Sequence, residues 1–266
     1  SALPEKAIPG FPRTSQSALT SDQLASAFKQ AKRLRTEAQL VEARDLLSDV
    51  YLNNRMTREQ RTRLADELEP LASEILRSRS ILGDGQLYEV EPGDVLVKIA
   101  RPFQVPPEFI MRINGIKRAG SIRPRQELKL VKGPFDVLVE LALFELTVLH
   151  HGKFVRRYPI GIGTRENPTP TGLFKVGTKL EKPAYFPTAT DHQRRGPIPP
   201  GGIPSGDPDN PLGSRWIDIG LGYGIHGTNE PDTVGREFSR GCIRLRNEDV
   251  EELYDMLTEG SRVLIR

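Results

Sequence analysis

The sequence contains a single cysteine, Cys242, among 266 residues, and only 6% of its residues are aromatic. One cysteine excludes a disulfide within the chain and any zinc site built from several cysteines. No run of 18 apolar residues is present, so no membrane-spanning helix is predicted. The 38 lysines and arginines nearly balance 35 aspartates and glutamates, and no dense basic stripe with interleaved aromatics indicates nucleic-acid binding. A chain of this length is expected to form two or three domains.

The first residues carry proline and glycine but no apolar pattern. Pro4, Pro9, Gly10 and Pro12 predict a flexible leader over residues 1–19 that has no core of its own. The chain starts with serine rather than methionine, which is compatible with an export signal or a membrane tether upstream.

The next stretch, residues 20–82, has helical periodicity. Thr20 with Gln23, and Thr57 with Gln60, have the spacing of a capping box, in which each side chain satisfies a free backbone amide at a helix start. Apolar residues then recur every three or four positions in three successive segments, which predicts a small helical bundle. A spacer or packing platform is favoured over a partner-binding groove.

Gly83 to Gly85 ends the helical pattern, and residues 86–132 resemble the LysM fold, a strand-helix-helix-strand unit that binds N-acetylglucosamine glycans. The likeness rests on the stretches from Tyr88 to Ala100 and from Ile122 to Leu128, together with Ile113-Asn114. Asp94 is expected to cap the first helix. Val95 stands where serine or threonine is usual, and Arg125 where glycine is usual, which favours the fold over strong glycan affinity. By resemblance, the glycan-binding residues are Gly93, Asp94 and Val95.

Residues 134–266 predict a mainly β domain, sandwich-like, with one packed helix. Short strands are expected at 136–143, 145–150, 153–163, 172–178, 216–219, 224–225 and 263–265. The single helix is expected to be capped by Asn247 and to end before Gly260. The proline-rich stretch 182–213 is expected to form a wall or lid of a substrate cleft. The fold class is therefore multi-domain α+β, with a helical bundle, a βααβ module and a β-rich domain.

Cys242 and His226 form the candidate catalytic pair. A thiol becomes a good nucleophile when an imidazole can take its proton. Two short strands, one entering the turn at His226 and one leaving Cys242, can lie side by side although sixteen positions separate the two residues. Gly241 leaves one flank of the sulfur open, so that backbone amides can face a developing oxyanion. The competing interpretation of Cys242, a buried small hydrophobe, is less favoured because of the glycine and the histidine.

The segments Ile225-His226-Gly227-Thr228-Asn229 and Ser239-Arg240-Gly241-Cys242-Ile243-Arg244-Leu245 resemble the active-site signature of the L,D-transpeptidase (YkuD-type) family. Residues 169–174 and 209–213 resemble further family segments, and the likeness runs from Phe135 to Ile265. It implies that the Gly227 carbonyl accepts from the far ring nitrogen of His226 and fixes its tautomer. The oxyanion and substrate-binding candidates are Gly241, Arg240, Ser239, Arg244, Thr228 and Asn229.

Arg240 stands where many family members have histidine, which bears on substrate preference rather than on the reaction. Arg244 alternates with the apolar Ile243 and Leu245, so it is either an exposed strand charge or a brace for the histidine turn or a substrate carboxylate.

The resemblance implies a transferase that acts on peptidoglycan stem peptides, forms 3-3 cross-links and needs no cofactor. It also implies an extracytoplasmic location in the periplasm or cell wall, and acylation by carbapenems. A carboxypeptidase that uses water, and a non-catalytic LysM wall-binding protein, are the alternatives. The sequence leaves the acceptor and the third stem residue open.

The remaining polar clusters give no metal site. His150 and His151 are adjacent on a predicted strand, point to opposite faces and are expected at the surface. Asp207 and Asp209 lack the glycine and glutamate of a calcium loop and are expected to form turns.

Overall fold

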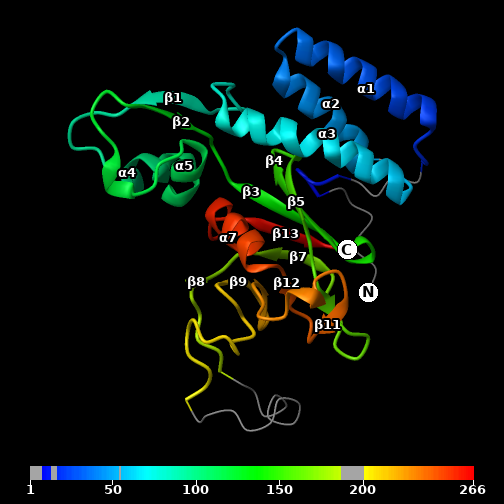
Figure 1. Cartoon of the computed structure of the whole chain (residues 1–266), viewed down its shortest axis with the longest axis vertical. Helices are drawn as coiled ribbons and strands as arrows, with labels where there is room; N and C mark the ends of the chain where they lie inside the picture. The colour runs from blue at the N-terminus through cyan, green and yellow to red at the C-terminus, as the bar shows by residue number, and fades with distance from the viewer. Residues whose placement is uncertain (1–7, 13–16, 54, 187–200) are drawn as a thin grey trace. The chain divides into compact units, whose positions relative to one another are not determined.

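The computed structural model describes residues 8–12, 17–53, 55–186 and 201–266 (Figure 1). The chain forms two compact units, one of Ser1–Leu138 with Thr147–Arg157 and one of Val139–Leu146 with Tyr158–Arg266. Helices dominate the N-terminal part and strands the C-terminal part, so the predicted α+β class is confirmed. Much of the predicted leader, and residues 187–200 of the predicted lid, lie outside the described residues.

Three helices open the first unit: α1 (Ser21–Thr36), α2 (Leu40–Asn53) and α3 (Arg58–Arg77), coloured blue to cyan in Figure 1. Both capping boxes are confirmed, because the threonine hydroxyl and glutamine side chain of each pair satisfy one another's backbone amides. Leucines and alanines on one face of each helix are buried, which is the pattern of an amphipathic bundle. The buried set includes Leu24, Ala27, Ala31, Leu47, Leu64, Leu68, Leu71 and Ile75.

Helix α2 packs against a strand of the same unit. Ser48 Oγ accepts a hydrogen bond from Phe154 N at 2.7 Å, and Arg44 Nη1 donates to Phe154 O at 3.2 Å. The Tyr51 and Phe154 rings meet edge to face, with centroids 5.3 Å apart. Because strand edges carry unpaired backbone groups, these side chains supply partners that a neighbouring strand would otherwise provide. The helix is therefore a packing platform for this strand.

The next module has the predicted strand-helix-helix-strand order. Strand β1 (Gln86–Glu89) pairs antiparallel with β2 (Glu127–Leu130), and α4 (Leu96–Ala100), η1 (Arg101–Phe103), α5 (Pro107–Ile113) and η2 (Ala119–Ser121) lie between them in the chain. The predicted cap was wrong: Val95 occupies the N-cap position, and no side chain caps the helix. Asp94 Oδ2 instead accepts from Glu91 N at 2.9 Å and from the Tyr88 hydroxyl at 2.7 Å, so its carboxylate is already used within the turn.

Strands β3 (Phe135–Glu140), β4 (Glu145–His150) and β5 (Lys153–Pro159) follow, with η3 (Leu141–Leu143) in between, and the boundary between the units falls within them. The predicted surface position of His150 was wrong, because this side chain is 2% exposed and its Nε2 donates to Lys132 O at 2.7 Å. His151 lies in the turn with φ of +50°, outside the strand. The two rings therefore contact each other, with centroids 4.2 Å apart, instead of pointing to opposite faces.

In the described part of the second unit, the strands are short and paired. One sheet has the order β12-β10-β9-β8, β6 pairs parallel with β11, and β7 pairs antiparallel with β13. Strands β8 and β11 were not predicted. The bounds are β6 (Ile162–Gly163), β7 (Gly172–Lys175), β8 (Lys179–Glu181), β9 (Arg215–Gly220), β10 (Tyr223–His226), η4 (Pro231–Thr233), β11 (Glu237–Ser239), β12 (Ile243–Arg244) and β13 (Arg262–Ile265).

One helix of this unit lies next to the sheet. Helix α7 (Asn247–Met256) begins three residues after β12, and it packs against β9 and β10. Val250, Leu253 and Met256 form its buried face. The predicted helix after Cys242 is therefore confirmed, although Asn247 is not its cap. Among the described helices, none has the length and apolar character needed to cross a bilayer.

Candidate active site

Strands β10 and β12 bring the histidine and cysteine segments together. They pair in parallel, with Ile225 opposite Ile243 and His226 opposite Arg244. Both isoleucines are fully buried, so one face of this ladder packs into the core. Because side chains alternate along a strand, His226 and Arg244 share the other face, and Cys242, directly before β12, lies on that same face. The predicted pair therefore occupies neighbouring strands on one side of a sheet.

Cys242 lies next to strand β10, near the backbone of Gly224 and the charge of Arg244. Its side chain is partly exposed, as a nucleophile that meets a substrate must be. Burial raises the pKa of the Cys242 thiol, whereas a hydrogen bond from the backbone of Gly224 and the positive charge of Arg244 act in the opposite direction. Burial dominates, so the protonated thiol is the resting form near neutral pH.

His226 is held in one tautomer by its neighbour in the chain. Its Nδ1 lies 2.6 Å from the carbonyl oxygen of Gly227, and since a carbonyl only accepts, Nδ1 carries the hydrogen. This is the contact that the family resemblance implied. Burial, and secondarily the charge of Arg244, lower the pKa of His226 to about 3, against the smaller opposing effect of the Gly227 hydrogen bond. The imidazole is therefore neutral, and Nε2 has a lone pair that can accept a proton.

Trp216 stacks on the imidazole and was not among the predicted site residues. It lies opposite His226 on strand β9, and the two rings are nearly parallel, at 20°, with centroids 5.6 Å apart. A side chain at Gly224 would collide with the indole, so the ring covers the backbone beside the thiol as well. The available signal was that Trp216 is the only tryptophan and lies on a predicted strand next to the histidine strand.

Gly241 has two structural reasons to be glycine. Its φ is +101°, which side chains rarely adopt, and a Cβ there would collide with the Tyr223 ring. Its amide donates to Ser239 Oγ at 3.2 Å, and the same hydroxyl donates to the Cys242 carbonyl at 2.5 Å. The Gly241 amide, one of the oxyanion candidates, is thus already hydrogen-bonded. Ser239 holds the loop before the cysteine in shape.

Arg244 is 9% exposed, which rules out the exposed strand charge considered from the sequence. Its Nη1 lies 3.4 Å from Glu230 Oε2, and its guanidinium lies 5.1 Å from the Phe238 ring centroid. Glu230 follows the histidine turn directly in the chain. Arg244 therefore links the cysteine strand to the end of that turn, and its charge reaches both His226 and Cys242.

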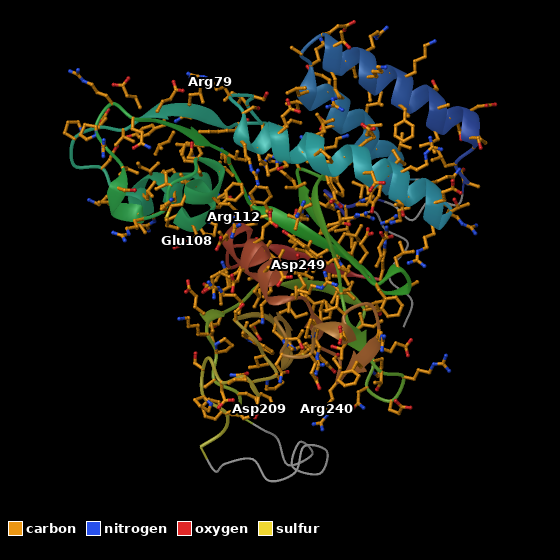
Figure 2. All side chains as sticks on the ribbon, in the orientation of Figure 1. Arg79, Glu108, Arg112, Asp209, Arg240 and Asp249 are labelled. Atoms are coloured by element: carbon orange, nitrogen blue, oxygen red, sulfur yellow. The ribbon has the colours of Figure 1, made fainter. Side chains whose placement is uncertain are left out.

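The other predicted turn residues have structural contacts. Thr228 is buried, and its Oγ1 accepts from Glu230 N at 3.0 Å. Asn229 Nδ2 donates to Pro208 O at 3.2 Å, which joins the histidine turn to the proline-rich stretch. Arg240 is half-buried directly after β11 and is labelled in Figure 2. The predicted glycan residues Gly93, Asp94 and Val95 lie in the first unit.

Asn247 does not cap its helix, which corrects the sequence prediction. The N-cap residue of α7 is Arg246, and no side chain caps this end. Asn247 Oδ1 accepts from Ser214 N at 3.0 Å, and Asn247 Nδ2 donates to Thr228 O at 3.1 Å. The side chain faces away from its own helix, because the histidine turn offers it an acceptor and the backbone before β9 offers it a donor.

A cavity of about 570 Å³ lies beside the histidine turn. The described part of the proline-rich stretch supplies one side of this cavity. Asp207 and Asp209 form a tight turn there, as predicted, in which Asp209 N donates to Asp207 Oδ1 at 2.9 Å (Asp209 is labelled in Figure 2). Within the described ranges, no group of three or more His, Cys, Asp or Glu side chains is placed to hold a metal ion. The cavity is lined by Lys182, Asp207, Asn210, Thr228, Asn229 and Asn247, among others.

Two stretches of the chain match known protein families. Residues 134–265 match the L,D-transpeptidase catalytic domain called YkuD, and residues 88–131 match the LysM domain. A putative L,D-transpeptidase, YqjB of Bacillus subtilis, is 37% identical over 150 residues, which cover 54% of this chain and 77% of that protein.

Two further proteins are similar to this chain. The putative L,D-transpeptidase YkuD of Bacillus subtilis is 31% identical over 186 residues, 67% of this chain and 97% of that protein. The NMR structure of the catalytic domain of the Enterococcus faecium L,D-transpeptidase matches with a TM-score of 0.39 and 25% identity, over 50% of this chain and 96% of that one.

Proposed function

We propose that this chain, which belongs to the YkuD family of L,D-transpeptidases, joins peptidoglycan stem peptides through a thioester on Cys242. Membership in this family makes the protein an acyltransferase. The match of residues 88–131 to the LysM domain supports peptidoglycan binding by that module. The proposal concerns the nucleophile, the intermediate and the bond that is formed.

In the first half-reaction, Cys242 Sγ attacks the carbonyl carbon of the third residue of a tetrapeptide stem. The thiol proton passes to His226 Nε2 as the new C–S bond forms. The amide bond to the terminal D-alanine then breaks, and the same proton goes to the departing amine. The enzyme is left as a thioester, and the free D-alanine leaves with its amine neutral at the moment of release.

In the second half-reaction, an amine on a neighbouring stem attacks the thioester carbonyl. Nε2 takes the proton of the attacking amine and returns it to the sulfur as the C–S bond breaks. The product is a 3-3 cross-link, and the thiol and neutral imidazole are restored. Each half-reaction moves one proton out of the nucleophile and into the leaving group, so one imidazole serves both.

The observation that carries this proposal is the shared face of the β10–β12 ladder, where His226 presents Nε2 because Nδ1 is engaged by Gly227. Since the pKa of His226 is lowered and that of Cys242 is raised, the resting state is a neutral pair rather than a thiolate and an imidazolium. Proton transfer therefore accompanies the attack, and the base acts at the step where charge develops.

The LysM domain and the catalytic domain together support a place of action outside the cytoplasmic membrane, where peptidoglycan lies. In this proposal the LysM domain holds glycan strands while the catalytic domain works on the peptides. Gly93 and Val95 are exposed in the turn before α4, as are Glu91 and Pro92, and Asp94 gives that turn its shape.

The test is intact mass after mixing with a carbapenem, comparing the wild-type chain with Cys242→Ala. The proposal predicts one adduct on the wild-type chain and none on the variant, because a carbapenem carbonyl reacts with the same sulfur. An equal adduct on both proteins would show that Cys242 is not the nucleophile.

Incubation with a purified tetrapeptide stem separates this function from its alternatives. A dimer with loss of D-alanine is the expected product. A tripeptide without any dimer would mean that water is the acceptor and the protein is a carboxypeptidase. Unchanged stem with both the wild-type chain and Cys242→Ala would indicate a wall-binding protein without this activity.

A further inference from the structure

Asn247 uses both ends of its side-chain amide on two loops that are far apart in the sequence. Its Oδ1 accepts from Ser214 N at 3.0 Å, and its Nδ2 donates to Thr228 O at 3.1 Å. Ser214 precedes β9, and Thr228 lies in the histidine turn. The residue therefore connects the start of α7 to the turn that follows His226.

Two glycines leave the room that the Asn247 side chain occupies. A Cβ at Gly213 or at Gly227 would collide with Asn247 Oδ1, and Gly213 also has a φ of +63°. A larger residue at either position would push the amide out of reach of its partners. The two backbone segments therefore approach the Asn247 amide as closely as only glycine allows.

The turn that Asn247 binds contains the carbonyl that fixes the tautomer of the His226 imidazole. Gly227 O accepts from His226 Nδ1, and the next carbonyl, that of Thr228, accepts from Asn247. The amide of Gly227 donates to Arg215 O at 3.2 Å. The plane of the peptide between Gly227 and Thr228 sets the direction of the Gly227 carbonyl, and Asn247 is hydrogen-bonded at the far end of that segment.

We propose that Asn247 is a positioning residue that aims the Gly227 carbonyl at Nδ1 and so keeps Nε2 of His226 as the proton acceptor. Asn247 contacts neither the sulfur nor the imidazole and acts through the turn. The inference rests on the proposed function for its effect on rate, but its effect on the tautomer of His226 is independent of any activity.

The side chain required here is specifically an amide. A carboxylate of the same shape could still accept from Ser214 N, but it would place an oxygen against Thr228 O, where no hydrogen bond can form. Asn247→Asp thus removes one of the two contacts with no change in volume, and Asn247→Ala removes both. The exposed Glu248, one residue further along the same helix, offers a matched control in Glu248→Gln.

The first readout is the tautomer of His226, measured by long-range ¹H–¹⁵N correlation of the histidine rings. The chain has four histidines, and His226→Gln identifies the signal. The wild-type chain and Glu248→Gln are expected to show Nδ1–H at His226, whereas both Asn247 variants show a mixture of tautomers. His150 serves as an internal reference, because its Nε2 donates to Lys132 O and its tautomer should not change.

The second readout is the rate of acylation by a carbapenem, corrected for the fraction of folded protein. Outer-shell changes that misorient a catalytic group typically cost about 10- to 100-fold. We expect a loss of about 10-fold in Asn247→Asp and a larger loss in Asn247→Ala, with the wild-type rate in Glu248→Gln.

A wild-type tautomer and a wild-type rate in folded Asn247→Asp would overturn the proposal. If Asn247→Ala does not fold, the isosteric aspartate variant still decides the question. If the wild-type chain itself is not acylated, the proposed function fails, yet the tautomer measurement continues to test the role of Asn247.

Discussion

Among the described residues, each unit of the molecule contains one buried histidine, and the two histidines differ in which ring nitrogen is not hydrogen-bonded to a carbonyl. His150, in the first unit, is 2% exposed and donates Nε2–H to Lys132 O. His226, in the second unit, is 4% exposed and donates Nδ1–H to Gly227 O. Burial lowers the pKa of both, to about 4 and to about 3.

The surroundings of the two rings give them different uses. His150 packs against the rings of Phe135 and His151, with centroids 5.1 Å and 4.2 Å away, and the charges of Arg44 and Asp136 also act on it. His226 stacks on Trp216 and shares a sheet face with Cys242 and Arg244. A buried, neutral imidazole with one carbonyl partner is therefore no sign of catalysis by itself. What matters is whether the second nitrogen faces a group that must lose a proton.

The largest effect expected from this comparison is on acylation. His226→Gln should slow carbapenem acylation of Cys242 at least about 1,000-fold, because the proton acceptor is lost. His150→Gln should leave the rate per folded molecule unchanged. Stopped-flow or mass-resolved kinetics on both variants measure this. Equal losses of rate in the two variants would contradict a catalytic role that belongs to His226 and not to His150.

The next effect is on stability at low pH. The unfolded chain binds a proton at His150 near pH 6.5, whereas the native state resists protonation until about pH 4, so stability falls as the pH decreases through this window. The difference corresponds to about 3 kcal/mol, and at pH 7 and above it vanishes because both states are neutral.

Urea unfolding at pH 7 and pH 4, followed by circular dichroism, checks this contribution. His150→Gln should lose less stability between the two pH values than the wild-type chain. His226 titrates in the same direction in both proteins, so its effect cancels in the difference. A wild-type pH dependence in His150→Gln would contradict the prediction.

The smallest effect concerns the ring that stacks on His226. Trp216→Ala removes the indole from one face of the imidazole and from above Gly224, so both the base and the backbone donor to the thiol lose support. We expect a loss of about 10-fold in the acylation rate at saturating carbapenem, since positioning errors of this kind cost one to two orders of magnitude.

Trp216→Phe keeps a ring in that place and is expected to recover most of the rate. Full activity in Trp216→Ala would show that the Gly227 hydrogen bond alone holds the histidine. The same change leaves the environment of His150 untouched, so the tautomer of His150 again serves as the reference.

Local sequence signals predicted the elements whose causes are local. The threonine-glutamine pairs gave the starts of α1 and α3, since a capping box involves only four successive residues. The βααβ order was also readable from the sequence. Three side chains were misjudged. Asn247 and His150 take partners that are distant in the sequence, namely two loops and the Lys132 carbonyl. Asp94 is used by the nearby Tyr88 hydroxyl of β1 and the Glu91 amide instead of by the helix start.

The sequence by itself determined the cysteine, the histidine and the motif around them, because these are one-dimensional patterns of residue type and spacing. Tertiary structure decided which strands pair. The pairing stacks Trp216 on the imidazole, buries Arg244 and lets Asn247 donate a hydrogen bond to the histidine turn. The physical reason is that hydrogen bonds and ring contacts form between groups close in space, and closeness across strands depends on sheet order and register.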